Sequence, residues 1–222
     1  FEASCHYFKK RANLHVTGNP RASEVGFVSK TAARKMLNMD ANLPFLLVVG
    51  GSRGAAKINE SAVGFLIRSA NNKKMQVLYI TGEIYYQGVL SRLRAAEMMQ
   101  FYGGRLLVRP YQEEMALALA AADLVITRAG ATTLAEITAL GTPAIVIPSP
   151  NVVHDHQLIN ARELARQGAA VLIEEQNLNA QLLEEHIFSL FGDPDKLSCM
   201  RKKSIGLGRP QAAADIYRLM LL

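Results

Sequence analysis

Short, nearly continuous apolar runs alternate along this chain with longer segments in which apolar residues recur at helical spacing. Runs of this kind are typical of strands that are buried on both faces of a sheet. We predict strands at residues 45–49, 76–81, 105–108, 123–127, 143–147 and 170–173. Helices are predicted between them at residues 55–71, 83–100, 113–122, 131–140 and 155–167. This alternation predicts an α/β fold, a doubly wound parallel sheet with helices on both faces.

The two ends of the chain depart from this alternation. Residues 1–13 form a short segment that precedes the pattern, and the sequence starts at Phe1 rather than Met, so we interpret the chain as a fragment or a processed form. Residues 14–20 are strand-like and end in the turn signal Gly18-Asn19-Pro20, which suits a linker. Beyond the last strand we predict C-terminal helices at residues 179–191, 194–205 and 211–222. We therefore assign the main domain to residues 14–222.

The composition supports a packed domain, because 50% of the residues are hydrophobic and 20% are charged. No apolar run approaches the roughly 20 residues of a membrane span. The net charge of +6 fits either an ordinary basic surface or attraction to anionic lipid or a phosphorylated substrate. Nucleic acid is not a predicted partner, because the basic residues are scattered and lack interleaved aromatics. Cys5 and Cys199 have neither disulfide-framework nor metal-site spacing, which favours a reducing cytoplasm.

Ligands of doubly wound sheets bind at the carboxyl ends of the strands. The loop Arg128-Ala129-Gly130-Ala131-Thr132 lies at such an end and opens a helix. Its amides and the positive end of the helix dipole can therefore hold a phosphate. Glu136 follows within the same helix and can accept hydrogen bonds from two hydroxyls, as a ribose offers. These features predict a nucleotide-diphosphate site, whereas a Glu136 on a solvated helix face is the alternative.

A glycine-rich segment, Gly50-Gly51-Ser52-Arg53-Gly54-Ala55, joins the first strand to the next helix. Glycines permit positive φ and a close approach of the backbone to a ligand, so the amides near Ser52 are candidates for binding a phosphate. The alternative is a tight turn that binds nothing. The segment lacks both the G-x-G-x-x-G spacing and the Lys-Ser/Thr end of a P-loop. This disfavours dinucleotide binding and hydrolysis of nucleoside triphosphates.

Polar side chains gather from His154 to Asn160, at the start of another helix. His154 and His156 have no third metal ligand nearby, so hydrogen bonding to sugar hydroxyls fits them better. Asp155 is expected to cap the helix. We predict no metal site and no cofactor.

Two remaining motifs have competing interpretations. Tyr111, Gln112 and Met115 follow the third strand and form either a flat slot for a base or a strand-end aromatic beside a helix core. Asp193-Pro194-Asp195 matches the D-x-D pattern of metal-dependent sugar transferases. Because it lies far from the strand-end loops, we interpret it as a helix cap and turn.

Taken together, the motifs resemble the C-terminal, donor-binding domain of the MurG-type peptidoglycan N-acetylglucosaminyltransferases. The resemblance covers about residues 1–222, and its specificity comes from the combination rather than from any single motif. The motifs are Thr17-Gly18-Asn19-Pro20-Arg21, Gly50-Gly51-Ser52-x-Gly54-Ala55, Asn59, Arg128-x-Gly130-Ala131-x-Thr133-x-x-Glu136 and Asp155-His156-Gln157-x-x-Asn160-Ala161. The resemblance implies the Rossmann-like half of a two-domain GT-B glycosyltransferase, with a nucleotide sugar bound between the halves.

The resemblance also implies a role for individual residues in binding UDP-N-acetylglucosamine. Diphosphate and sugar would contact Gly51, Ser52, Arg53 and Gly54, and the phosphates would contact Ala129, Gly130, Ala131 and Thr132. Uracil would lie against Tyr111, Gln112 and Met115, the ribose hydroxyls against Glu136, and the transferred sugar against His156 and Gln157, supported by Asn160. Asn19 and Arg21 are further candidates. Some members carry a basic residue two positions after the proline, where this chain has Ala22.

The activity implied is an inverting, metal-independent transfer of N-acetylglucosamine from its UDP donor to undecaprenyl-diphospho-N-acetylmuramoyl-pentapeptide, lipid I. The general base and the lipid I site would lie in the missing N-terminal domain, whose tail residues 1–13 resemble. This chain is therefore expected to bind donor but to transfer poorly alone. The full-length protein is expected to be cytoplasmic and peripheral to the inner face of a bacterial membrane. The alternatives are a UDP-glucose or UDP-galactose lipid glycosyltransferase, a non-catalytic nucleotide-sugar module and, more weakly, a UDP-sugar isomerase, for which only Glu136 is an acidic candidate.

Overall fold

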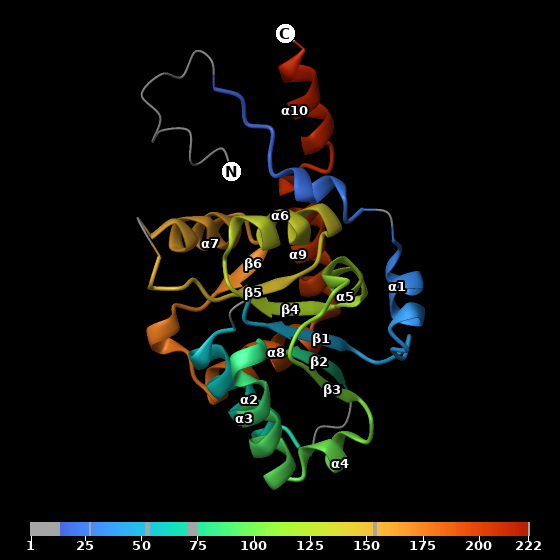
Figure 1. The fold of residues 1–222 in the computed structure, drawn as a ribbon, viewed down its shortest axis with the longest axis vertical. Coiled ribbons are helices and arrows are strands. Elements are labelled where there is room, and N and C mark those ends of the chain that lie inside the picture. Colours follow the sequence, from blue (N-terminus) through green and yellow to red (C-terminus); the bar gives the residue numbers. More distant parts are fainter. Residues whose placement is uncertain (1–13, 27, 52–53, 71–74, 153–154, 222) are drawn as a thin grey trace.

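A computed structural model of the chain describes residues 14–26, 28–51, 54–70, 75–152 and 155–221. Six parallel strands form one sheet in the order β3-β2-β1-β4-β5-β6 (Figure 1). The strands are β1 (Phe45–Val49), β2 (Gln76–Ile80), β3 (Leu106–Arg109), β4 (Leu124–Thr127), β5 (Ala144–Val146) and β6 (Ala170–Leu172). The order runs outward from β1 in both directions, which confirms the doubly wound α/β fold. Each predicted strand is present, and each boundary agrees within one residue.

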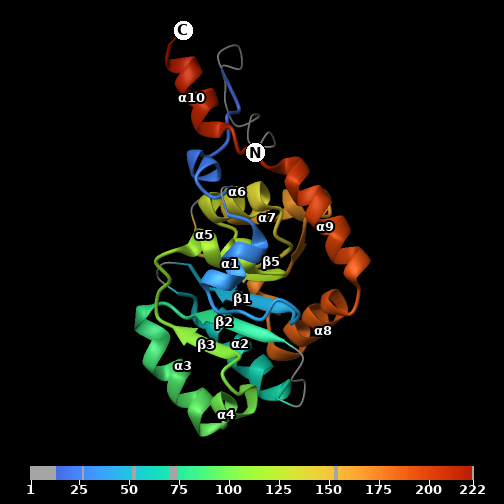
Figure 2. The same cartoon turned by 90° about the vertical axis from the view of Figure 1, so that its right-hand side faces the viewer.

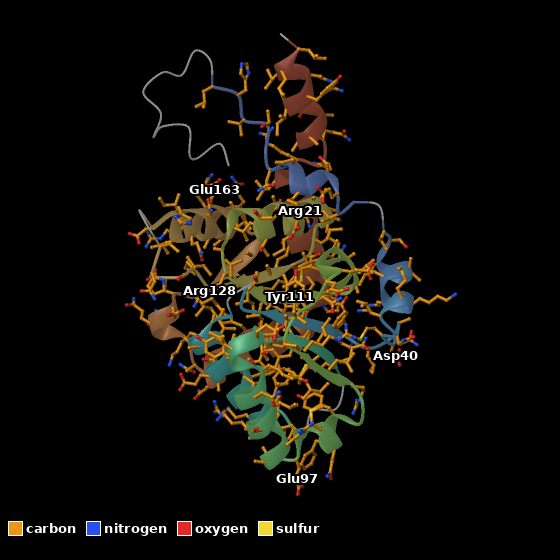
Figure 3. The ribbon with its side chains drawn as sticks, viewed as in Figure 1. Arg21, Asp40, Glu97, Tyr111, Arg128 and Glu163 are labelled. Atoms are coloured by element: carbon orange, nitrogen blue, oxygen red, sulfur yellow. The ribbon has the colours of Figure 1, made fainter. Side chains whose placement is uncertain are left out.

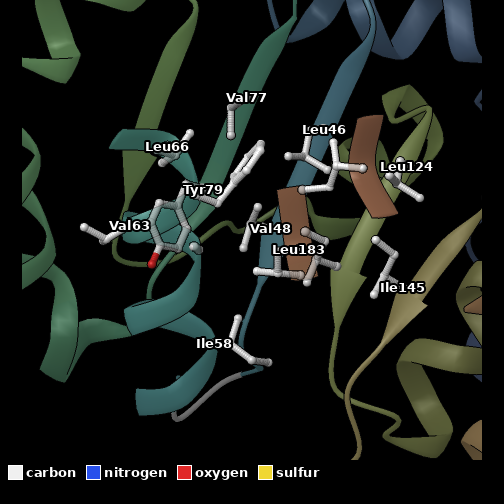
Figure 4. Close-up of a cluster of buried hydrophobic side chains, with 14 of the residues drawn as sticks. Leu46, Val48, Ile58, Val63, Leu66, Val77, Tyr79, Leu124, Ile145 and Leu183 are labelled. Carbon is white, nitrogen blue, oxygen red and sulfur yellow. The ribbon is translucent and has the colours of Figure 1, made fainter. Parts of the chain in front are cut away.

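Alternation along the strands divides the core into two layers, one on each face of the sheet. In β1, Leu46 and Val48 belong to one buried cluster, whereas Phe45, Leu47 and Val49 belong to the other. The first cluster, shown in Figure 4, also contains Ile58 and Leu66 of α2 and Leu183 of α8. The second contains buried residues of α1, α5, α6 and α7. Because both faces are covered, the strands are apolar throughout, as the sequence indicated.

The described residues form ten α-helices. They are α1 (Lys30–Met36), α2 (Ala56–Arg68), α3 (Glu83–Ala95), α4 (Met98–Tyr102), α5 (Met115–Ala121), α6 (Ala131–Leu140), α7 (His156–Arg166), α8 (Ala180–Phe191), α9 (Pro194–Leu207) and α10 (Ala212–Met220). Short 3-10 turns occur at η2 (Pro20–Ser23) and η4 (Glu175–Asn177). The three predicted C-terminal helices correspond to α8, α9 and α10.

One prediction of helix boundaries was wrong. The single helix predicted at 83–100 is split into α3 and α4, because Glu97 adopts a left-handed conformation with φ 58°. The strand-like stretch 14–20, which we interpreted as a linker, has no regular structure before Pro20 begins η2. A strand needs a neighbour for its amides and carbonyls, and the described sheet pairs nothing outside its edge strands β3 and β6. The tail predicted at residues 1–13 lies outside the described residues.

Helix α1 was not predicted; its buried Ala33 belongs to the second core cluster, and polar contacts add to that packing. Ser29 caps it by accepting a hydrogen bond from Ala32 N at 3.3 Å. The buried Arg34 donates from Nε to the carbonyl oxygen of Ala121 at 3.1 Å, which ties α1 to the end of α5. The segment between the linker and β1 is thereby fixed against the second core layer.

The C-terminal helix α10 extends away from the sheet beside the first described residues of the chain (Figures 1 and 2). It packs against η2, where Ser23 Oγ accepts a hydrogen bond from Ala213 N at 3.1 Å. Tyr217, Met220 and Leu221 remain exposed. None of the described helices combines the length with the apolar character that a membrane span requires.

Candidate functional site

A cleft of about 900 Å³ lies at the carboxyl ends of β1, β4 and β5. The sequence order of the strands reverses between β1 and β4, which is the point where ligands of doubly wound sheets bind. Of the predicted residues, the cleft is lined by Gly51, Gly54, Gly130 and Gln157. Ser52 and Arg53, predicted between the two glycines, lie outside the described residues, as does His154.

A second hollow, of about 480 Å³, lies on the linker side of α6. Three predicted residues, Asn19, Ala131 and Asn160, contribute to its walls together with residues of the linker and of α6. The predicted residues are therefore distributed on both sides of the first turn of α6, with Ala131 next to the N-cap Gly130. The amides of this turn can be approached from either hollow.

The beginnings of three helices meet at the cleft without side-chain caps. No described side chain accepts a hydrogen bond at the N-caps of α2, α6 and α7, which are Ala55, Gly130 and Asp155. The first amides of such helices have no intrahelical acceptor and carry the positive end of the helix dipole. An anion in the cleft would satisfy them, and this supplies positive potential without a charged side chain.

The glycines shape this edge in two ways. At Gly54, φ is 69° and an added Cβ would lie 2.6 Å from both the carbonyl oxygen of Thr81 and the ring of Tyr85. Glycine is therefore required there for the loop to pack against the end of β2. At Gly130, φ is −68° and an added Cβ would meet no atom within 4 Å. That open space allows a ligand to approach the first turn of α6.

Glu136 lies on the side of α6 that faces η2, and it is buried rather than on a solvated helix face. Its Oε1 accepts hydrogen bonds from Nε and Nη2 of Arg21, at 3.3 and 3.2 Å. Burial raises the pKa of Glu136, and the guanidinium of Arg21 opposes that rise. One turn earlier, Thr132 Oγ1 accepts a hydrogen bond from Asn19 Nδ2 at 3.3 Å. Figure 3 shows Arg21 beside α6 and Arg128 nearer the edge of the sheet.

The polar residues of α7 are arranged around neighbouring backbone. Gln157 Oε1 accepts a hydrogen bond from Ser149 N at 2.9 Å, and Asn160 Nδ2 is 3.5 Å from the carbonyl oxygen of the buried Ala129. His156 is exposed at the first position of the helix. The prediction that Asp155 caps α7 was wrong, because this residue is left-handed, with φ 49°, and its side chain accepts no capping bond.

The residues predicted to hold a base line neither of these two hollows. Tyr111 is 57% exposed, whereas Gln112 is buried and its Oε1 accepts a hydrogen bond from Arg109 at 2.6 Å. Met115 packs against the second core cluster. The structure therefore agrees with the helix-core alternative for Met115 and leaves the ring of Tyr111 accessible.

The interpretation of Asp193-Pro194-Asp195 as a cap is confirmed, since Asp193 Oδ1 accepts a hydrogen bond from Lys196 N at 2.9 Å. Among the described residues, no group of three or more His, Cys, Asp or Glu is placed to hold a metal ion.

Sequence reasoning missed several residues that line the cleft, including two ion pairs. Lys57 pairs with Glu60 at 3.1 Å on the first turns of α2, and Arg128 pairs with Glu175 of η4. Arg128 also donates to the carbonyl oxygen of Ile147 at 3.3 Å. A usable signal existed, because Lys57 lies two residues after the glycine-rich segment and Glu175 lies three residues after the last strand, at the same edge of the sheet.

These observations define a class of domain, a doubly wound α/β domain in which the uncapped beginnings of three helices lie at a cleft at the switch point. The sequence model of the glycosyltransferase family 28 C-terminal domain matches residues 45–216. The chain therefore belongs to this family.

Curated relatives extend the similarity over nearly the whole chain. UDP-N-acetylglucosamine--N-acetylmuramyl-(pentapeptide) pyrophosphoryl-undecaprenol N-acetylglucosamine transferase from Natranaerobius thermophilus is 39% identical over 99% of this chain. The enzyme of the same name from Caldanaerobacter subterraneus subsp. tengcongensis is 43% identical over 99% of it. The chain spans 60% and 59% of the length of these two relatives.

Solved structures show the same fold. MurG from Acinetobacter baumannii superposes with a TM-score of 0.69 at 26% identity, covering 88% of this chain and 53% of that one. The C-terminal CMP-Kdo binding domain of WaaA from Acinetobacter baumannii superposes with a TM-score of 0.60 at 10% identity, covering 79% of this chain and 93% of that domain. The second similarity concerns the fold alone.

Proposed function

We propose that this chain is the donor-binding part of an inverting N-acetylglucosaminyltransferase of peptidoglycan synthesis. It binds UDP-N-acetylglucosamine and, together with an N-terminal domain, transfers the sugar to undecaprenyl-diphospho-N-acetylmuramoyl-pentapeptide. The observation that carries the proposal is the cleft at the switch point, where three helices begin without side-chain caps. The names of the relatives support the choice of donor and acceptor. Such a protein would work at the cytoplasmic face of the membrane, as a peripheral enzyme.

The backbone supplies the positive potential that the donor diphosphate needs. The amides of Gly51, Ser52, Arg53 and Gly54 would hold one side of the diphosphate, and the first turn of α6, from Ala129 to Thr132, the other. When the acceptor hydroxyl attacks the anomeric carbon, the bond to UDP breaks and negative charge grows on the leaving diphosphate. Fixed donors aimed at such charge typically contribute about 3 kcal/mol each to the stability of the transition state. In other transferases, a metal ion stabilises this negative charge.

Sugar, ribose and base would bind around this diphosphate. We assign the transferred sugar to His156 and Gln157, with Asn160 supporting, and the ribose hydroxyls to Glu136. Uracil would lie by Tyr111, Gln112 and Met115. Gln112 would contact uracil through its backbone, because its side-chain oxygen already accepts a hydrogen bond from Arg109.

The acidic residues of the cleft do not suit the role of general base. Glu60 pairs with Lys57, and Glu175 pairs with Arg128, so each carboxylate that lines the cleft is neutralised by a cation. We therefore assign the base that deprotonates the acceptor to the N-terminal domain. The same pairing disfavours a UDP-sugar isomerase, which needs acidic catalytic groups beside the sugar.

Calorimetric titration tests the proposal with UDP-N-acetylglucosamine, UDP-glucose and UDP, each with and without magnesium. We expect saturable binding that is independent of magnesium and prefers the N-acetyl sugar. Equal binding of both sugars would favour a UDP-glucose lipid glycosyltransferase, and absence of UDP binding would refute the donor site. A parallel transfer assay with lipid I should show little or no product, and turnover close to that of a complete transferase would refute the assignment of the base.

A further inference from the structure

The contact between Arg21 and Glu136 joins the linker to the proposed ribose site across 115 positions of sequence. Arg21 is the second residue of η2, and its side chain is 48% exposed, whereas that of Glu136 is only 7% exposed. A buried carboxylate without a partner loses much of its hydration, so a charge-assisted hydrogen bond is needed to keep it ionised. Arg21 supplies that bond from outside the helix.

The two oxygens of Glu136 have different surroundings. Both hydrogen bonds from Arg21 end on Oε1, so the lone pairs of that oxygen are occupied. Among the described residues, no hydrogen bond is formed to Oε2. One oxygen of the carboxylate is therefore bound to the linker, whereas the other receives no hydrogen bond from the described residues.

The guanidinium of Arg21 is bound to two carboxylates. Nε and Nη2 bind Glu136, and Nη1 binds Glu24 at the end of η2. These bonds use three of its five N–H groups. Two of the three go to Glu136, the more buried of the two carboxylates, which suits a group that holds Glu136 in place.

The linker that carries Arg21 is in turn held on two sides. Asn19 donates to Thr132 on α6, and Ser23 accepts from Ala213 at the start of α10. Gly18, with φ 91°, lies so close to Arg209 that an added Cβ would be 2.9 Å from its side chain. The position of Arg21 therefore depends on how the linker lies between α6 and the chain that leads into α10.

We propose that Arg21 is a positioning residue of the donor site, which holds Oε1 of Glu136 and so presents Oε2 to the hydroxyls of the ribose. This inference rests on the proposed function, because it needs a nucleoside diphosphate at α6. Arg21 acts through Glu136 and does not touch the ligand. Donor affinity is then coupled to the linker, and a displaced linker weakens binding of the ribose.

A thermodynamic cycle between the arginine and the ribose hydroxyls tests the proposal. The affinities of UDP and of 2′,3′-dideoxyuridine 5′-diphosphate are measured by calorimetry for the unmodified chain, Arg21→Ala, Arg21→Lys and Arg166→Ala. Arg166 is the matched control, because it is 69% exposed and pairs with Glu163 on α7. Thermal unfolding of each variant verifies that it is folded.

We expect Arg21→Ala to weaken UDP binding about tenfold, the loss typical of one charge-assisted hydrogen bond. The same change should alter the affinity of the dideoxy ligand less than about twofold, because that ligand offers no hydroxyl to Glu136. Arg21→Lys should restore part of the loss, since lysine keeps the charge but not the fork. Arg166→Ala should alter neither affinity.

A pH series adds a readout that a purely structural role would not change. The charged groups that shift the pKa of Glu136 are Arg21 of η2 and Glu24, which directly follows η2. The facing helix α5 carries no charge, and the basic residues of α9 are not among these groups. Without Arg21 the pKa of Glu136 rises further, so the ratio of variant to unmodified dissociation constants for UDP should grow as pH falls from about 8 to about 5.5. Protonation of UDP itself cancels in this ratio.

Each contrary result identifies what failed. Equal losses for both ligands would overturn the proposal, because Arg21 would then contact the phosphates. If the unmodified chain binds the dideoxy ligand as tightly as it binds UDP, Glu136 does not bind the ribose and this inference is refuted. The proposed diphosphate site would not be affected by that result. If the unmodified chain binds no UDP, the proposed function itself is refuted.

Discussion

Gly51 and Gly54 both have positive φ, 88° and 69°, but their surroundings differ, and alanine substitutions can separate strain from steric overlap. An added Cβ at Gly51 meets no atom within 4 Å, whereas at Gly54 it would lie 2.6 Å from the carbonyl oxygen of Thr81. A left-handed conformation costs an alanine roughly 1–2 kcal/mol. Forcing a methyl group into packed surroundings adds roughly 1–3 kcal/mol. We therefore expect Gly51→Ala to lower the free energy of unfolding by about 1–2 kcal/mol and Gly54→Ala by about 2–5 kcal/mol.

The assay is thermal and urea unfolding of the unligated chain. For a domain of this size, 1 kcal/mol corresponds to roughly 2–4 °C in Tm, so the two variants should differ by several degrees. The effect of a Gly-to-Ala change on the unfolded chain is the same at both positions and cancels in the comparison. Equal destabilisation of the two variants would refute the reasoning, because the loop would then move away from β2 at no cost.

Three further predictions concern single side chains. Asp193→Ala should lower the free energy of unfolding by about 1 kcal/mol through loss of the α9 cap, and calorimetry should find UDP affinity unchanged. Tyr79→Phe removes the buried hydrogen bond of 2.9 Å to Asn59 Oδ1, and urea unfolding should show a loss of about 1–3 kcal/mol; no loss would mean that water satisfies the amide. Burial raises the pKa of Glu136 in the folded chain, so its contribution to stability is present below the unfolded pKa and is lost as pH rises through the folded one. Stability of Glu136→Gln relative to the unmodified chain should therefore increase between about pH 4 and about pH 7, and a flat difference would contradict the shift.

The sheet could be predicted from the sequence because a strand buried on both faces is a short continuous apolar run. This pattern can be recognised without reference to any other part of the chain. A run such as Phe45–Val49 has few alternatives in a domain of this composition. Helix α1 has no such pattern, because its buried residues are only Ala33 and the polar Arg34, which donates a hydrogen bond to a carbonyl distant in sequence. The break at Glu97 was equally hidden, because a non-glycine residue with φ 58° follows from tertiary packing and not from its own preference.

The features of the site fall into the same two groups, those that depend on local sequence and those that depend on distant contacts. Features that depend on local backbone, such as the glycine loop after β1 and the start of α6, could be placed from sequence alone. Features that depend on partners distant in sequence could not: the ion pair of Arg128 with Glu175 joins residues from different strand ends, and that of Arg21 with Glu136 joins the linker to α6. No local pattern of residues predicts such a pair, because its two residues are far apart in sequence and come into contact only in the folded chain.

These pairs also decide what the cleft presents to a ligand. Lys57 and Glu60 neutralise each other, as do Arg128 and Glu175, so the charged side chains described around the cleft add little net potential. What remains unbalanced is backbone: the first amides of α2, α6 and α7, fixed in direction by the helices behind them. Fixed dipoles need no rearrangement when charge develops on a leaving diphosphate, whereas long cationic side chains must first be ordered. The open space at Gly130 and the absence of caps at these helices therefore agree with one arrangement, in which the charged side chains are paired with each other and the backbone would hold the anion of the proposed donor.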